Sequence, residues 1–287
     1  MIAGYIALTK PKIISLLLLT ALGGIFLATQ GIPDPLLCLI VLLGGSLAAG
    51  GANAINHFLD RDIDGKMSRT QGRPIVSGSI KPPYALLFGI VLNVVAFGIL
   101  WGYTNLLSAI LALSATLFYV FIYTMALKRT TAQNIVIGGA AGAIPPMVGW
   151  AAVTGDILDP APILLFAIIF FWTPPHFWAL ALLLKDDYAD AGIPMLPVVS
   201  GIDTTKKQIF LYTWILLALM IITVLTTSRL GIIYGACSIS LTVIFMWMTW
   251  RLMKEDGIER AKSTYLFSLA YLALVFLSVM IDASVSI

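Results

Sequence analysis

The sequence has few charges for its length. Of its 287 residues only 11% are Asp, Glu, Lys or Arg, and the net charge is +3. This composition excludes an ordinary soluble domain, and a net charge this small gives no support for a nucleic-acid partner. Histidine and cysteine are equally scarce, at two residues each. Cys38 and Cys237 lie in apolar segments without CxxC or Cys/His spacing, so we expect buried free thiols.

Apolar residues are abundant instead, at 60% of the chain, with a mean hydropathy of +0.98. Windows of about 19 residues identify nine apolar stretches that are long enough to cross a bilayer. We therefore predict an all-α polytopic membrane protein, a single domain over residues 1–287, with its helices bundled around a central cavity. No cleavable signal is expected, because Lys10 and Lys12 lead directly into the first stretch. The predicted stretches are 12–30, 36–59, 83–103, 106–126, 132–153, 160–184, 208–227, 231–253 and 263–282.

Basic residues gather at one end of the predicted bundle. They precede the first stretch or follow the second, fourth, sixth and eighth, and Arg229 alone among the 17 Lys and Arg residues falls on the opposite side. Because cytoplasmic loops carry the excess of Lys and Arg, this pattern predicts a cytoplasmic N-terminus and an external C-terminus in the cell membrane. The two long polar loops, near 60–82 and 185–207, then face the cytoplasm.

A short internal repeat relates these two loops. Asp64 stands ten residues before the run PIVSG at 74–78, and Asp187 stands ten residues before PVVSG at 197–201. The offset of 123 residues also relates Lys128 to Arg251. This indicates a possible four-helix duplication, about 1–130 and 131–254, with a ninth helix added, although so short a match also arises by chance. A parallel repeat would place both acidic loops at one end of a shared cavity.

The first loop, NHFLDRDIDGKMSRTQGRP at 56–74, is rich in oxygen ligands. Asn56, Asp60 and Asp64 are spaced i, i+4 and i+8, so on a helix that extends past the membrane they share one stripe. Like charges repel there unless a cation lies among them. Oxygen ligands without Cys or a His pair suit Mg²⁺, which binds through one or two carboxylates plus substrate phosphates. Arg69 and Arg73 are then available to the phosphate oxygens.

The neighbours of this stripe have other interpretations. Asp62 lies off the stripe and fits a solvated acid or an arginine partner, and His57 flanks the stripe as a neighbour, not a ligand. The alternative for the whole loop is a solvated segment without a ligand.

The second loop, KDDYADAGIPMLP at 185–197, carries Asp186, Asp187 and Asp190. A second Mg²⁺ site facing the first would hold a diphosphate from both sides and offset the charge that develops on its departure. A solvated helix end is the alternative here too.

The sixth apolar stretch contains WTPPHFW at 172–178. His176 lies about ten residues before its cytoplasmic end, roughly 15 Å deep at 1.5 Å per residue. The paired prolines here, like Pro145 and Pro146 in the fifth stretch, predict interrupted helices that border a cavity. An ionisable residue at this depth is a functional candidate, and a hydrogen-bonded structural histidine is the alternative.

Together these residues resemble the UbiA-type intramembrane prenyltransferases over nearly the whole chain. The NxxxDxxxD motif is typical of the superfamily, whereas PHFW at 175–178 and the DY…IPMLP run at 187–197 resemble the branch that farnesylates haem. The second motif of the superfamily, DxxxD, fits Asp186 and Asp190, but the haem branch keeps an Asp-Tyr pair, which favours Asp187 and Tyr188. Further matching residues are Asp60-Arg61, Met67-Ser68-Arg69-Thr70, Arg73-Pro74, Tyr123-Thr124 and Leu127-Lys128-Arg129.

The resemblance implies transfer of the farnesyl group of farnesyl diphosphate to a vinyl group of haem b, with addition of water, giving haem O and diphosphate. Membrane lipid and proteins that deliver haem or modify the product are the further partners that it implies. Two rivals remain: a UbiA-type enzyme acting on a quinone precursor or a glycerol phosphate, and a transporter of an anionic solute. The implied roles are catalysis for Asp60, Asp64, Asp187 and Tyr188; Mg²⁺ binding for Asn56, Asp60, Asp64 and Asp187; diphosphate binding for Arg69, Arg73, Lys128 and Arg129; and haem binding for His176.

Overall fold

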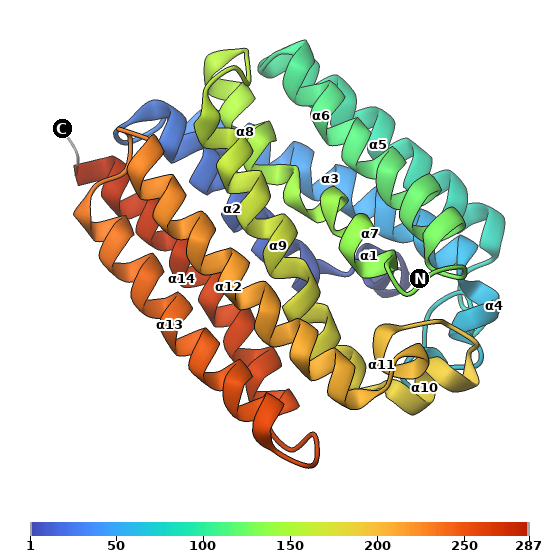
Figure 1. Cartoon of the computed structure of the whole chain (residues 1–287). Coiled ribbons are helices and arrows are strands. Elements are labelled where there is room, and N and C mark those ends of the chain that lie inside the picture. Colours follow the sequence, from blue (N-terminus) through green and yellow to red (C-terminus); the bar gives the residue numbers. More distant parts are fainter. Residues whose placement is uncertain (1, 286–287) are drawn as a thin grey trace.

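The structure, a computed structural model, describes residues 2–285, and helices make up most of them (Figure 1). Within that range nine helical segments are long and apolar enough to span a membrane. This confirms the predicted all-α multi-pass fold, while the direction of insertion stays a prediction. The spans are α2 (Pro11–Thr29), α3 (Pro35–Leu59), α5 (Pro82–Tyr103), α6 with η2 (Leu106–Leu117 and Phe118–Leu127), α7 with α8 (Asn134–Ala143 and Pro145–Thr154), α9 (Pro160–Leu183), α12 (Ile202–Thr226), α13 (Ile232–Lys254) and α14 (Ala261–Val285).

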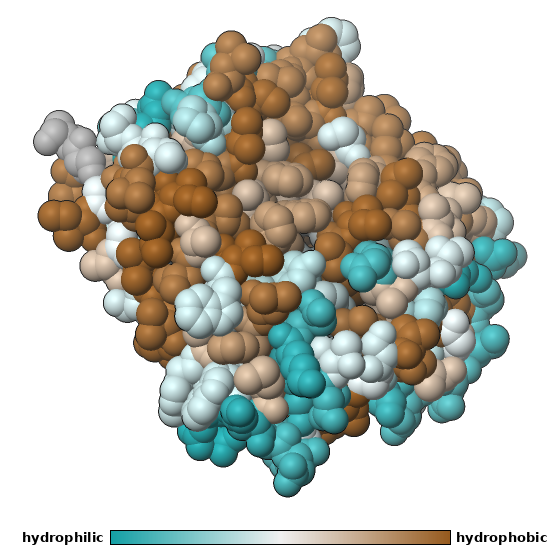
Figure 2. Space-filling model, viewed as in Figure 1, coloured by the Kyte–Doolittle hydropathy of each residue, from teal (hydrophilic) through white to brown (hydrophobic). Residues whose placement is uncertain are grey.

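Short helices gather at one end of this bundle. They are α4 (Arg61–Asp64), η1 (Ser68–Thr70), α10 (Lys185–Asp190) and α11 (Leu196–Val199). The N-terminal α1 (Ile2–Thr9), which hydropathy did not predict, packs through Leu8 against Ala54 of α3 and against Ile80. Figure 2 shows the largest gathering of polar residues at the same end and a smaller one at the opposite end, while apolar residues cover most of the visible body. The visible apolar body between the two ends is therefore compatible with contact to lipid.

Small residues let the helices approach closely. A Cβ atom at Gly24 of α2 would lie 2.0 Å from the carbonyl oxygen of Pro146 in α8, and one at Gly149 would lie 2.0 Å from that of Ala21. Because lipid tails are as apolar as leucine, packing of this kind drives helix association in membranes more than apolar burial does. A side chain at either glycine would force α2 and α8 apart.

Several expectations need correction. The helix α12 begins at Ile202, six residues before the predicted start, because charged residues lower the hydropathy of its first turns. One of these, Lys206, is buried and donates to the carbonyl oxygen of Glu255 at 2.7 Å. Cys237 was expected to be buried, but it is exposed on the outer surface of α13.

The proline prediction holds for one helix only. The fifth span is interrupted before Pro145, which begins α8. The sixth was expected to break too, but α9 continues through Pro174 and Pro175. The fixed φ of proline is compatible with a helix, and the preceding Thr173 adds a hydroxyl bond to the Ile169 carbonyl at 2.8 Å. The expected interruption beside His176 was therefore wrong.

The two repeated segments share local geometry. Ser77 N donates to Arg73 O at 2.9 Å, and Ser200 N donates to Leu196 O at 2.8 Å, at the same offset of 123 residues. Each serine precedes a glycine with positive φ, Gly78 at 75° and Gly201 at 80°. The four-helix duplication stays a prediction, and this shared turn is the structural feature on which it rests.

Candidate active site

The two polar loops that the sequence singled out lie against each other. Ser68 donates its hydroxyl hydrogen to the carboxylate of Asp187, with Oγ lying 2.9 and 3.0 Å from the two oxygens. The Arg69 Nη2 lies 3.5 Å from the Tyr188 hydroxyl, and its guanidinium lies 5.9 Å from the ring centroid of that tyrosine. Beneath them the loops share one apolar cluster that includes Ile63, Met67, Tyr188, Ile193 and Met195.

This contact distinguishes among the aspartates of the second loop. Asp187 faces the first loop, whereas Asp186 and Asp190 are exposed. The geometry therefore brings Asp187 and Tyr188 to the shared site, in agreement with the Asp-Tyr interpretation of this loop. The apolar residues of IPMLP fix that orientation by packing.

The acidic stripe lies where α3 ends. Asp60 caps α3 and leads into α4, but the bonds from Asp60 N to Asn56 O (2.9 Å) and from Asp64 N to Asp60 O (2.8 Å) preserve helical spacing. Asn56 Nδ2 donates to Asp60 Oδ2 at 2.7 Å. The side chains of Asp60 and Asp64 are nearly inaccessible, with 0% and 2% of each residue exposed. The predicted stripe is thus present and buried, although the helix does not run straight through it.

Basic side chains neutralise these carboxylates. Lys128 Nζ lies 2.5 Å from Asp60 Oδ2, and Arg73 Nη1 lies 2.6 Å from Asp64 Oδ2. Arg129 lies 3.8 Å from Asp60 Oδ1. Buried carboxylates need such partners, because an isolated buried charge is very costly.

Arg129 also has a second partner. It pairs with Asp62 at 2.7 and 2.8 Å, and its hydrogen bond holds the pKa of the Asp62 carboxyl down, to about 2. Of the two interpretations offered for Asp62, the structure supports the arginine partner.

A π-helical segment, η2, positions Lys128. The wider turn is closed by the bond from Lys128 N to Tyr123 O at 2.8 Å, five residues back. It also brings the Thr124 hydroxyl within 3.2 Å of Asn56 Nδ2. Segments of this type occur frequently at functional sites, and no feature of the hydropathy pattern predicted this one.

Lys10 is a site residue that the sequence analysis missed. Its Nζ donates to Asn56 Oδ1 at 3.0 Å, and burial lowers the pKa of Lys10 to about 7, with Arg73 and Lys128 acting in the same direction. Its φ of 54° lies in the left-handed region, which a residue other than glycine adopts at a cost. The following Pro11 was the one signal in the sequence, since proline disfavours the right-handed helical conformation before it.

His57, which was expected to be a neighbour of the stripe and not a ligand, is buried. Only 2% of it is exposed, and neither ring nitrogen makes a hydrogen bond among the described residues. A buried polar group without a partner costs free energy, but no contact makes His57 a ligand, so its place as a neighbour of the stripe stays a prediction.

The donor set fits Mg²⁺. Asp60 Oδ1 is buried without a hydrogen-bond partner. Oxygen atoms of Asn56, Asp64 and Asp187 are of the type that Mg²⁺ prefers, and they now accept hydrogen bonds from Lys10, Arg73 and Ser68. No cluster of three or more His, Cys, Asp or Glu ligands occurs within residues 2–285. Mg²⁺ does not need one, because it retains waters and completes its coordination with substrate phosphates.

His176 lies apart from this cluster, between α9 and α14. Its Nδ1 and the Ser268 hydroxyl are 2.7 Å apart, and its ring stacks against Trp172 and Tyr265 with centroids 4.3 and 4.9 Å away. Nε2 makes no hydrogen bond to any residue from 2 to 285. One nitrogen therefore orients the ring while the other remains available, a combination typical of metal-ligating histidines and also compatible with a structural role.

Comparison with known proteins gives a consistent result. Residues 17–276 match the UbiA prenyltransferase family. The protoheme IX farnesyltransferase of a Nostoc species is 50% identical over 98% of this chain and 89% of its own length. That of a Synechocystis species is 49% identical over 97% and 88%.

Solved structures share the fold. One described as digeranylgeranylglyceryl phosphate synthase aligns with a TM-score of 0.78 at 20% identity, over 99% of this chain and 98% of its own. A UbiA homologue from Archaeoglobus fulgidus, bound to GPP and Mg²⁺, aligns with a TM-score of 0.73 at 18% identity, over 96% and 99%.

Proposed function

The chain belongs to the UbiA prenyltransferase family, and from this we propose that it transfers the farnesyl group of farnesyl diphosphate to a vinyl group of haem b. The observation that carries the proposal is the 50% identity, over 98% of the chain, to a protein named for this acceptor. The contact between the two polar loops supports it, because it gathers acidic and basic groups suited to a metal-bound diphosphate.

We assign the head of the prenyl substrate to the acidic stripe. Asn56, Asp60, Asp64 and Asp187 would hold Mg²⁺, which when bound supplies positive charge to the departing diphosphate. Arg69 has no carboxylate partner within residues 2–285, so its guanidinium is available to phosphate oxygens from the start.

The other basic residues would change partners. Lys128 and Arg73 now bind the carboxylates of Asp60 and Asp64, and the metal would compete for these same oxygens. Their ammonium and guanidinium groups can then turn toward the diphosphate. Tyr188, whose hydroxyl lies beside Arg69, would position that arginine.

The bond changes are those of an alkylation. The bond between C1 of the farnesyl group and the diphosphate oxygen breaks, and the terminal vinyl carbon of haem b bonds to C1. Water adds to the other vinyl carbon and loses a proton, which leaves a hydroxyl group. The apolar bundle keeps bulk water away from the allylic carbon until the new carbon–carbon bond has formed.

We assign the haem to His176. Trp172 and Tyr265 both stack on the imidazole and Phe177 lies nearly perpendicular to it, so a ligand would approach through the ring edge at Nε2. Ligation of the haem iron by Nε2 is the contact that this arrangement favours.

The decisive experiment is an assay of the purified protein with haem b and farnesyl diphosphate, followed by mass spectrometry. We expect a product heavier than haem b by one farnesyl group plus one hydroxyl group, with the oxygen of labelled water in that hydroxyl. A chelator should stop turnover, and added Mg²⁺ should restore it. If the protein instead prenylates a phenolic acid or a glycerol phosphate and ignores haem, the family assignment stands but the proposed acceptor is wrong.

The distribution of basic residues further supports a location in the cell membrane with the polar loops in the cytoplasm. A reporter enzyme fused to the C-terminus should then show its activity on the external side of the membrane and none in the cytoplasm. Cytoplasmic activity of that reporter would reverse the proposed orientation.

A further inference from the structure

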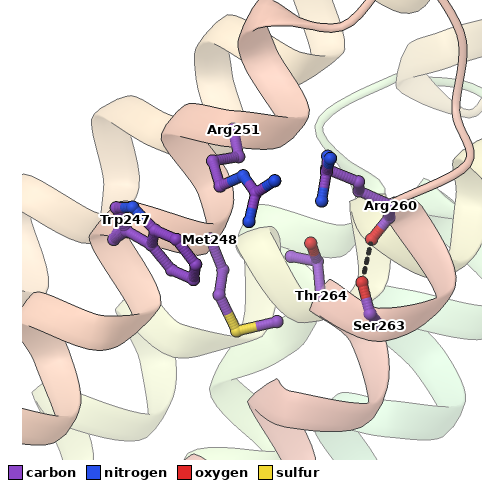
Figure 3. Close-up of a pocket in the computed structure, with 6 residues that line it drawn as sticks. All are labelled: Trp247, Met248, Arg251, Arg260, Ser263 and Thr264. Carbon is purple, nitrogen blue, oxygen red and sulfur yellow. Dashed lines mark hydrogen bonds between the residues drawn. The ribbon is translucent and has the colours of Figure 1, made fainter.

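A hollow lies between α13 and α14, at the same end of the bundle as the candidate active site but formed by neither of its loops (Figure 3). Its volume is about 100 Å³, several times the roughly 10–15 Å³ that one water molecule requires. The residues that line it are Trp247, Met248, Arg251, Arg260, Ser263 and Thr264.

Two arginines bring positive charge to this hollow. Arg251 lies with its guanidinium 4.8 Å from the ring centroid of Trp247, and it pairs with no carboxylate among residues 2–285. Arg260 binds Glu255 through Nε at 3.3 Å, which leaves its two terminal nitrogens for another acceptor. Figure 3 shows both guanidinium groups directed into the same space. Two guanidinium groups that converge in this way match the oxygens of a phosphate group.

An unsatisfied hydroxyl completes the site. Thr264 is 0% exposed, and its Oγ1 makes no hydrogen bond. In Figure 3 this hydroxyl points toward the space between the two arginines. The Ser263 hydroxyl is already engaged, since it donates to Arg260 O at 2.9 Å. Thr264 lies in the first turn of the 25-residue helix α14, whose N-terminal dipole also favours an anion.

We propose that this hollow binds the phosphate group of an anionic membrane phospholipid. The neighbouring surface indicates lipid as the source. Trp247 and Trp250 are 52% and 45% exposed on α13, and tryptophan is enriched at the depth of lipid headgroups. A lipid whose phosphate contacts Arg251 and Arg260 would lay its acyl chains along this apolar helix face. The proposal is independent of the prenyl-transfer assignment.

The test uses the full-length protein in detergent, titrated with phosphatidylglycerol or phosphatidylcholine and observed by native mass spectrometry. The wild-type protein should bind phosphatidylglycerol more tightly than phosphatidylcholine. The Arg251→Gln and Arg260→Gln variants should each lose about tenfold in affinity, as expected for a lost charged hydrogen bond. Thr264→Val should lose less, and Lys262→Gln, which removes an equal charge from an exposed neighbour outside the hollow, should change affinity less than twofold.

Three outcomes would overturn the proposal. Equal affinity for the two lipids would show that the hollow does not select an anionic lipid, because phosphatidylcholine carries the same phosphate group but no net charge. An equal loss in Lys262→Gln would indicate general charge attraction. Inorganic phosphate that displaces the lipid at equal concentration would identify a solute site. Unchanged thermal unfolding of each variant without lipid shows that the variants are folded.

Discussion

Neutralising Asp60 tests the candidate active site most directly. This carboxylate is fully buried, accepts from Asn56 at 2.7 Å and pairs with Lys128, whose side chain is only 12% exposed. In Asp60→Asn the ammonium of Lys128 faces a neutral amide. Removing one partner of a buried pair costs about 3–5 kcal/mol. Because Lys128 keeps some contact with solvent, we expect about 3 kcal/mol, which lowers the unfolding midpoint by on the order of 10 °C.

A second substitution separates stability from chemistry. The double variant Asp60→Asn/Lys128→Met removes both charges, so it should recover most of the lost midpoint. Its prenyl-transfer rate should nevertheless stay at least about 100-fold below that of the wild type, because the metal ligand is still missing. Asp60→Asn, Lys128→Met and the double variant form a double-mutant cycle. Thermal unfolding in detergent measures the change in stability, and the haem assay measures the change in turnover.

Recovery of activity together with stability in the double variant would refute the reasoning. Asp60 would then serve only to neutralise Lys128. A midpoint of Asp60→Asn equal to that of the wild type would refute the energetic argument instead.

Three further predictions follow from individual contacts. Asp187→Asn should reduce turnover about 100-fold, whereas the exposed Asp186→Asn should have little effect, and equal losses would remove the distinction between them. His176→Ala should weaken haem binding and shift the pigment spectrum without changing farnesyl diphosphate binding, and Ser268→Ala should shift the spectrum while retaining haem; normal spectra in both would leave the histidine structural. Asp62 has a pKa lowered from 3.8 to about 2, so its stabilisation is present above about pH 4 and lost as the pH falls through about 2. Asp62→Asn should therefore cost under about 1 kcal/mol in thermal unfolding at pH 7 and nothing near pH 2, and a cost that grows on acidification would contradict this.

The membrane fold was predictable because it depends on length and hydropathy alone. A span needs about 20 apolar residues, and the nine stretches satisfy this without reference to packing. The predicted helix ends were wrong where a tertiary contact stabilises a charged residue inside a helix. Hydropathy places Lys206 in a loop, but the residue is buried in α12, where its ammonium group donates a hydrogen bond to the Glu255 carbonyl oxygen.

In the candidate site, only contacts between residues close together in the sequence could be predicted. A separation of four residues predicts that Asn56 and Asp60 touch, and they do. The contact between Ser68 and Asp187 joins residues 119 positions apart, so it requires the packed fold. The conformation of Lys10 and the π-helical segment before Lys128 likewise arise from tertiary packing, with no periodic pattern to indicate them.

Charge balance in the site changes one argument drawn from the sequence. Two opposed acidic loops, taken from the sequence alone, would repel an anionic solute unless metal were bound, which argues against a transporter. In the folded chain Lys128 pairs with Asp60 and Arg73 pairs with Asp64, so each of these two buried carboxylates has a cationic partner. These carboxylates are therefore neutralised even without metal, and repulsion no longer separates the two functions. What separates them is membership of the prenyltransferase family, together with a buried Asp60 oxygen that lacks a hydrogen bond, which suits a metal ligand and which anion transport does not require.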